Sequence, residues 1–172
     1  MNRPTRRLTR SALLAALGCA LLYISAVIPS GRIALVAVSG LLTAAALIHC
    51  GIFHSIAVFA TTAVLSAAII PLKSCAVLYA VFLGYYPIAK SLFERLKSRV
   101  LEWVCKLALF NGALTCLWIL GRSVFLPGEV PGFFEKYIIL AYILMNLVFI
   151  VYDLGISKLI SFYIIRISKH ID

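Results

Sequence analysis

Acidic residues are scarce in this chain of 172 residues, which contains six Asp and Glu against sixteen Lys and Arg. The acids are scattered, so the sequence offers no carboxylate cluster for general acid–base chemistry or for a hard metal ion. Charged residues of both signs make up only 13% of the chain, well below the share in an ordinary soluble domain. These shortages argue against a soluble enzyme, and we predict no catalytic residues and no enzymatic activity.

Paired cysteine motifs are also missing. The five cysteines stand singly in apolar runs, without the spacing that metal sites or disulfide frameworks require. His49, Cys50 and His54 come closest to a ligand set, but no carboxylate lies near them in the sequence to complete it. We therefore predict neither a metal site nor a cofactor, and we interpret the cysteines as small buried apolar residues.

Apolar residues, in contrast, are abundant. They make up 63% of the chain, and the mean hydropathy is +1.07. A helix needs about 20 apolar residues to cross a bilayer, and six runs of roughly that length are separated by turn residues such as Gly51 and Pro71. We predict an all-α, polytopic membrane protein in which residues 1–172 form one domain. The predicted transmembrane helices span residues 11–29, 33–49, 52–70, 72–89, 100–120 and 137–157.

The positions of Lys and Arg predict the orientation of these helices. Ten of them precede the first helix, lie between the fourth and fifth, or follow the sixth. The opposite side holds only Arg32, Lys73, Arg122 and Lys136. Because short loops rich in Lys and Arg stay in the cytoplasm, we predict cytoplasmic termini and a bacterial cytoplasmic membrane location. The positive charge suits anionic lipids, and we predict no nucleic-acid partner because the chain has no folded basic surface.

Polar residues inside the fifth and sixth predicted helices fall at matching depths. Each costs about 2.5 to 3.5 kcal/mol at mid-membrane and therefore tends to face a partner or a cavity. With antiparallel helices, Lys106 is level with Asp153 and Asn111 with Asn146, while Glu102 shares a face with Lys106. We predict that Lys106 and Asp153 pair across the helix interface. The pattern leaves open whether this pair is a packing clamp or a proton or ligand relay.

The segment between the fourth and fifth helices has an unusual composition. Gly84 and Pro87 are expected to weaken or kink the fourth helix near its cytoplasmic end. Beyond them, apolar residues repeat on one helical face, and they are Leu92, Leu96, Val100 and Trp103. This spacing predicts an amphipathic connector over about residues 90–100 that lies on the inner membrane surface. Such a connector serves either as a membrane anchor or as a cytoplasmic docking site.

Small residues recur at intervals of four in the first helix, at Ala12, Ala16 and Ala20, and small side chains allow close helix contact in lipid. The opening from Arg7 to Leu17, the length, the six spans and the cytoplasmic termini together resemble the S components of energy-coupling factor transporters. These are the substrate-capturing subunits of bacterial vitamin and metal importers. An Ala-x-x-x-Ala motif in their first helix contacts a transmembrane coupling subunit. The resemblance implies that role for Ala12 and Ala16, extended by Ala20, with ABC-type ATPases as further partners.

The same resemblance implies a ligand pocket on the outer side, among the fourth to sixth helices. The candidate lining residues are Tyr79, Thr115, Trp118, Arg122, Tyr142 and Asn146. The chain is then expected to bind a vitamin or another small micronutrient for import, without chemistry. The alternative is a non-catalytic structural subunit of a bacterial envelope or cell-shape complex, which needs a docking face but no pocket.

Overall fold

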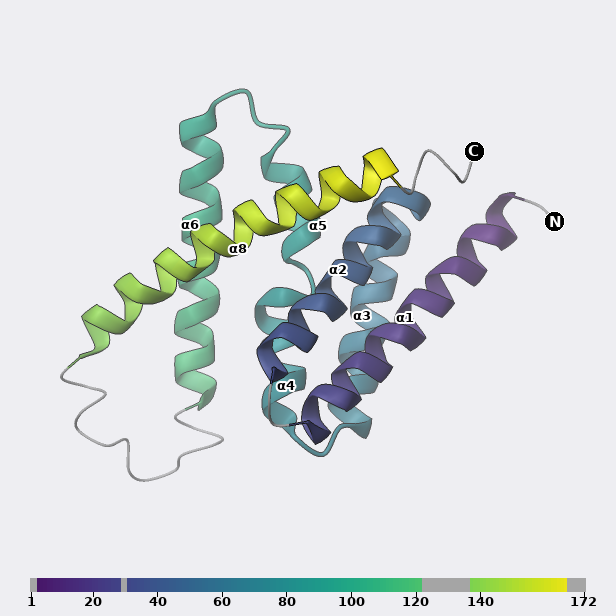
Figure 1. Cartoon of the computed structure of the whole chain (residues 1–172), viewed down its shortest axis with the longest axis horizontal. Coiled ribbons are helices and arrows are strands. Elements are labelled where there is room, and N and C mark those ends of the chain that lie inside the picture. The colour runs from purple at the N-terminus through teal and green to yellow at the C-terminus, as the bar shows by residue number, and fades with distance from the viewer. Residues whose placement is uncertain (1–2, 29–30, 122–136, 167–172) are drawn as a thin grey trace. The chain divides into compact units, whose positions relative to one another are not determined.

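The computed structural model describes residues 3–28, 31–121 and 137–166. All regular elements in these ranges are helical, which confirms the predicted all-α class, and six helical segments are long and apolar enough to cross a membrane. The elements, shown in Figure 1, are α1 (Arg3–Val27), α2 (Arg32–Cys50), α3 (Ile52–Ile69), α4 (Lys73–Leu78), the π-helix η1 (Tyr79–Leu83), α5 (Tyr86–Phe93), α6 (Arg99–Leu120) and α8 (Ile138–Arg166).

The chain divides into two compact units, Met1–Lys106 and Leu107–Asp172, called here the first and second unit. Helix α6 begins in the first unit and continues into the second. The single domain predicted from the sequence therefore stays a prediction.

Helices α1, α2 and α3 pack against one another in the first unit (Figure 1). Helix α1 buries one narrow face, formed by Ser11, Ala15, Gly18, Leu22 and Ser25. These residues recur every three or four positions, as expected for a helix with one packed side. Most of them are small, so the helix backbones approach closely and gain dispersion contacts where lipid offers no hydrophobic driving force.

Hydroxyl groups bridge these helices. Ser39 Oγ in α2 donates to the Gly18 carbonyl oxygen in α1 at 3.2 Å, and Thr62 Oγ1 in α3 donates to the Ala15 carbonyl oxygen at 3.4 Å. Both hydroxyls are buried. Because a buried hydroxyl without a partner is costly, these bonds favour the observed register of the three helices.

The fourth membrane-length segment is interrupted, as predicted from Gly84 and Pro87. It consists of α4, the π-helix η1, a turn at Gly84 and α5, with Pro87 in the first turn of α5. A Cβ atom at Gly40 of α2 would collide with the carbonyl oxygen of Leu83, and one at Gly84 would meet the ring of Tyr79 at 2.7 Å. The wider π-turn thus lies where α2 and η1 come closest, and π-turns of this kind often mark functional sites.

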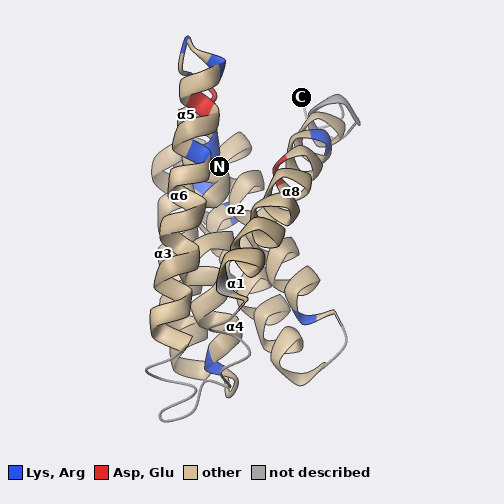
Figure 2. Ribbon diagram, turned by 90° about the vertical axis from the view of Figure 1, so that its left-hand side faces the viewer, with Lys and Arg blue, Asp and Glu red and all other residues tan. Residues whose placement is uncertain are grey.

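The start of α1 and the end of α2 lie at the same end of the first unit. The Cys50 thiol donates to the Arg7 carbonyl oxygen at 3.6 Å, and the chain then reverses at Gly51, whose φ of 90° favours glycine. Helix alternation brings the end of α5 to this same end, and in Figure 2 the ribbon near the α5 label carries Lys and Arg positions in blue beside an acidic position in red. This arrangement agrees with the charge pattern, while the orientation in a membrane stays a prediction.

One predicted helix is interrupted, and another extends beyond its predicted transmembrane span. Helix α5 ends at Phe93 and the chain turns over residues 94–98, so no continuous amphipathic helix covers 90–100. Its supposed apolar face is interrupted, and Leu92, Leu96 and Val100 are all exposed. Helix α8 continues to Arg166 instead of ending at 157, because no glycine or proline follows Gly155 to stop it.

Candidate functional site

The second unit contains a polar cluster between α6 and α8, built around two amide side chains. Asn111 Nδ2 donates to Asn146 Oδ1 at 3.0 Å, and Asn146 Nδ2 donates back to Asn111 Oδ1 at 3.1 Å. This reciprocal pair confirms that the two asparagines lie opposite each other on α6 and α8, as predicted, while their depth in a membrane stays a prediction. In an apolar environment such a pair also satisfies groups that would otherwise be costly to bury.

A second polar contact lies one turn away on both helices. The hydroxyl oxygens of Thr115 and Tyr142 are 3.0 Å apart, and Thr115 Oγ1 also donates to the Asn111 carbonyl oxygen at 2.8 Å. On the other side of the amide pair, the rings of Phe110 and Phe149 stack with their centroids 4.5 Å apart. The polar cluster thus has an aromatic pair on one side and the Thr115–Tyr142 hydroxyls on the other.

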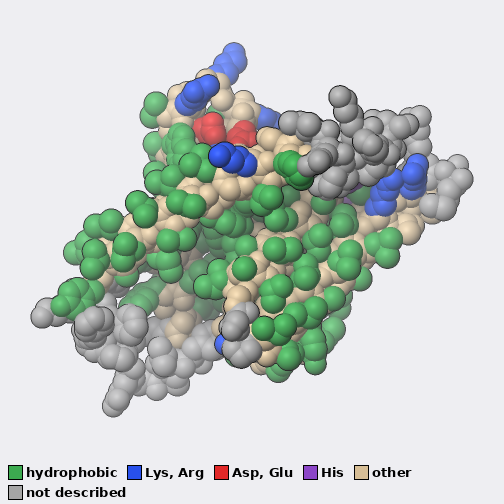
Figure 3. All heavy atoms as spheres, viewed as in Figure 1, with side chains coloured by type: hydrophobic (Ala, Val, Ile, Leu, Met, Phe, Trp, Pro, Cys, Tyr) green, Lys and Arg blue, Asp and Glu red, His purple; other side chains and the backbone are tan. Residues whose placement is uncertain are grey.

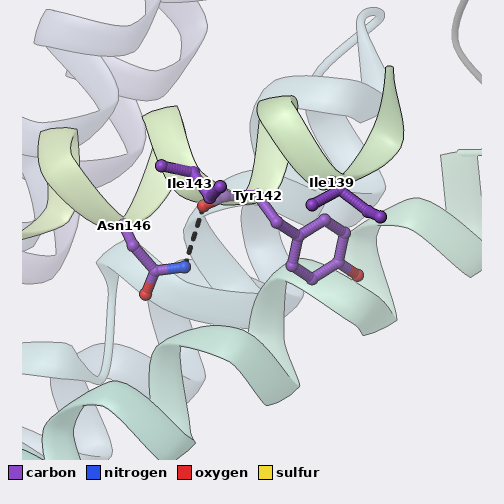
Figure 4. A pocket seen from close by; sticks show the side chains of 4 residues that line it. All are labelled: Ile139, Tyr142, Ile143 and Asn146. Atoms are coloured by element: carbon purple, nitrogen blue, oxygen red, sulfur yellow. Dashed lines mark hydrogen bonds between the residues drawn. The ribbon is translucent and has the colours of Figure 1, made fainter. Parts of the chain in front are cut away.

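A pocket opens on α8 beside this cluster. The described residues that line it are Ile139, Tyr142, Ile143 and Asn146, all within two turns of the helix. Figure 4 shows that Asn146 also donates to the Tyr142 carbonyl oxygen, at 2.8 Å. The pocket combines two isoleucine side chains with one phenol and one amide. The pocket is open, and its described lining offers a small molecule apolar contact together with two polar groups.

The structure brings together three of the six predicted pocket residues, Thr115, Tyr142 and Asn146. Trp118 is half-buried on α6, and Arg122 lies outside the described residues. Tyr79 belongs to the first unit, where it is fully buried and its hydroxyl is 3.1 Å from Thr43 Oγ1. The structure gives Tyr79 a packing role, and its contact with a ligand stays a prediction.

The predicted partner surface on α1 is free of packing within the first unit. Ala12, Ala16 and Ala20 are all exposed, and they lie on the side of α1 away from its buried face. Their neighbours Leu13 and Leu17 are also exposed. Figure 3 shows hydrophobic side chains over the outer surface of these helices. The alanines therefore form a shallow, smooth strip with larger apolar side chains beside it, a shape that suits a second transmembrane helix.

Lys106 is buried and takes part in ion pairs within the first unit. Its Nζ lies 2.7 Å from Glu102 Oε1, which confirms that these two residues share a face of the helix, and 3.5 Å from Glu94 Oε1. Asp153 is buried on α8, in the other unit. The predicted Lys106–Asp153 pair joins the two units and stays a prediction.

The ion cluster that surrounds Glu94 was not predicted from the sequence. Lys90 is 1% exposed, and its Nζ lies 3.0 Å from the same Glu94 Oε1 that Lys106 approaches. A single carboxylate therefore binds lysines from α5 and α6 and holds the turn between them. The spacing of four between Lys90 and Glu94 signals a helical pair, but not their contact with Lys106.

Metal binding has no support in the described part of the chain, where no three His, Cys, Asp or Glu residues are grouped as ligands. His54 instead packs edge-on against Phe53, with ring centroids 6.0 Å apart.

Comparison of the chain with protein-family models, with curated proteins and with solved structures finds no match in any of the three. The features of the molecule that bear on its function are therefore the alanine strip on α1 and the polar cluster on α6 and α8.

Proposed function

We propose that the chain is the substrate-binding membrane subunit of an importer of the energy-coupling factor type, which captures a vitamin or another small micronutrient without chemical change. The observation that carries this proposal is the exposure of Ala12, Ala16 and Ala20 on a helix whose opposite face is packed. Such a strip is suited to docking on a coupling subunit in the membrane. The pocket on α8 supplies a candidate ligand site in the same chain.

The direct test is purification of the full chain from its native host in mild detergent, followed by mass spectrometry of the proteins that accompany it. We expect two ABC-type ATPases and one further membrane protein. Replacing Ala12 and Ala16 together with leucine fills the strip and should abolish their recovery. The matched control is Ala57→Leu with Ala60→Leu, which adds the same volume to exposed positions of α3. Equal loss of the partners in both double variants would contradict the proposal.

A structural subunit of an envelope or cell-shape complex is the second candidate. It is favoured by the exposed side chains of Arg95, Lys97 and Arg99, which extend from the turn held by Glu94 and offer a positive surface to an acidic partner. The same purification distinguishes the two functions. Recovery of envelope-synthesis or cytoskeletal proteins without ATPases supports this second function, particularly if it depends on these three cations.

A further inference from the structure

The hydrogen bonds of the α6–α8 cluster use every donor of its two amides. Asn111 Nδ2 donates to the Leu107 carbonyl oxygen at 2.8 Å as well as to Asn146 Oδ1. Asn146 Nδ2 donates to the Tyr142 carbonyl oxygen as well as to Asn111 Oδ1. Each amide has two N–H groups, so none is left over. The backbone carbonyls also fix the amide orientations, because an amide oxygen placed there would have no donor to accept from.

The two hydroxyl groups of the cluster are also used as donors. Thr115 has a single O–H, which it donates to the Asn111 carbonyl oxygen at 2.8 Å. In the 3.0 Å contact with Tyr142, the phenol must therefore be the donor and Thr115 the acceptor. The groups that keep capacity for a further partner are oxygen lone pairs on Asn111 Oδ1, Asn146 Oδ1, Thr115 Oγ1 and Tyr142 Oη. Of these residues, Asn146 and Tyr142 line the pocket. In this hydrogen-bond arrangement, the four polar side chains of the cluster offer a further partner acceptors and no unused donor.

Tyr142 and Asn146 line the pocket on α8, beside Ile139 and Ile143 (Figure 4). We propose that this pocket binds a small, partly apolar molecule through a hydrogen-bond-donating group, either a hydroxyl, an amine or another N–H. A carboxylate or phosphate needs donors, and among the described lining residues it would meet the oxygen atoms of Tyr142 and Asn146 and two isoleucine side chains. Sites built with fixed hydrogen-bonding groups discriminate strongly against ligands that leave those groups unpaired. Among the described lining residues, the free hydrogen-bonding capacity therefore favours a ligand that carries a donor over an anion.

This inference rests on the proposed function in one respect: if the chain is an importer subunit, the ligand of this pocket is the substrate that it captures. The pocket itself can be tested without any partner protein. A suitable probe set is benzylamine, benzyl alcohol and benzoate, which share a ring and differ in the polar group. Binding to the full chain in lipid nanodiscs is measured by isothermal titration calorimetry, with empty nanodiscs as the reference for partition into lipid.

We expect the amine and the alcohol to bind at least about tenfold more tightly than benzoate, because each forms bonds that benzoate cannot form. Equal or tighter binding of benzoate overturns the inference, and so does the absence of binding by all three probes. This comparison uses the unaltered chain, so a folding defect cannot produce the result.

Tyr142→Phe then locates the site, because it removes a lining oxygen and keeps the ring. The loss of one hydrogen bond should weaken amine and alcohol binding about fivefold and leave benzoate unchanged. The control is Tyr23→Phe, at an exposed tyrosine of α1. Donor preference that is unaffected by Tyr142→Phe overturns the placement in this pocket. If the chain prefers donor-bearing probes but no ATPases co-purify with it, the pocket inference is supported and the importer proposal is contradicted. If ATPases co-purify but the chain shows no preference for donors, the importer proposal is supported and the pocket inference is contradicted.

Discussion

At the scale of single residues, the position of a polar residue along its predicted helix indicates only some of the pairs that the structure contains. Asn111 and Asn146 were expected at one level, and their reciprocal bonds follow from that level. Lys90 was counted among the cytoplasmic cations, yet it is buried beside Glu94. Its burial depends on how the turn after α5 folds back, and a one-dimensional hydropathy pattern does not contain that information.

Removal of one amide of the asparagine pair should cost more than removal of both. Asn146→Leu leaves the Asn111 amide without its partner, and we expect a loss of about 1 to 2 kcal/mol in unfolding free energy. In the double variant Asn111→Leu with Asn146→Leu, no amide is left unpaired and part of this loss should return. Unfolding of the purified chain in mixed detergent micelles provides the measurement. Strictly additive losses in the double-mutant cycle would show that the two amides are not coupled.

Two glycines should respond in opposite directions to alanine. Gly40→Ala puts a methyl group against the backbone carbonyl of Leu83, and we expect a loss of about 1 to 3 kcal/mol because that backbone cannot move aside without disturbing η1. Gly112→Ala, within α6, adds a Cβ that meets nothing within 4 Å and should be neutral or stabilising by about 0.5 to 1 kcal/mol. The same unfolding assay compares them, and equal effects would argue against the close contact of α2 and η1.

At the scale of helices, the apolar composition and the turn residues predicted six membrane-length segments, but they did not predict the irregularities within them. The interruption of the fourth segment was predictable from Gly84 and Pro87, whereas the π-turn of η1 was not. That turn coincides with the contact between Gly40 and Leu83, which joins residues 43 positions apart. The prediction of an amphipathic connector was wrong for a similar reason. Its spacing fitted a helix, but ion pairs from α5 and α6 to Glu94 accompany a turn instead.

Glu94 should therefore control the order of the connector. Glu94→Gln removes the charge that Lys90 and Lys106 share, and the turn with its exposed Arg95 and Lys97 should open more often. Trypsin cleavage in this turn should then be roughly fivefold faster, the change expected for about 1 kcal/mol of local stability. Glu135→Gln, distant in sequence, serves as the charge-matched control. Equal cleavage rates in the two variants and the native chain would mean that Glu94 does not hold the turn.

At the scale of the whole molecule, the distribution of charge predicts which end of each helix faces the cytoplasm. Fusions of alkaline phosphatase and green fluorescent protein can read this orientation in cells. A fusion after Ser98 follows four membrane-length segments, and one after Leu120 follows five. We expect a fluorescent, phosphatase-inactive product at Ser98 and the reverse at Leu120, because phosphatase is active only outside the cytoplasm. A fusion at the C-terminus should behave like the one at Ser98.

The cations of the connector allow the physical cause of this orientation to be tested. Replacing Arg95, Lys97 and Arg99 with glutamine removes the exposed charges and leaves Lys90, Glu94 and Lys106 in their ion pairs. If loop cations set the orientation, phosphatase activity at Ser98 should rise while the folded connector is retained. An unchanged pattern would assign the orientation to the four arginines at the start of α1, Arg3, Arg6, Arg7 and Arg10, which lie at the same end of the first unit. In that case, substituting those arginines alone should raise the phosphatase activity of the Ser98 fusion, which the connector variant does not change.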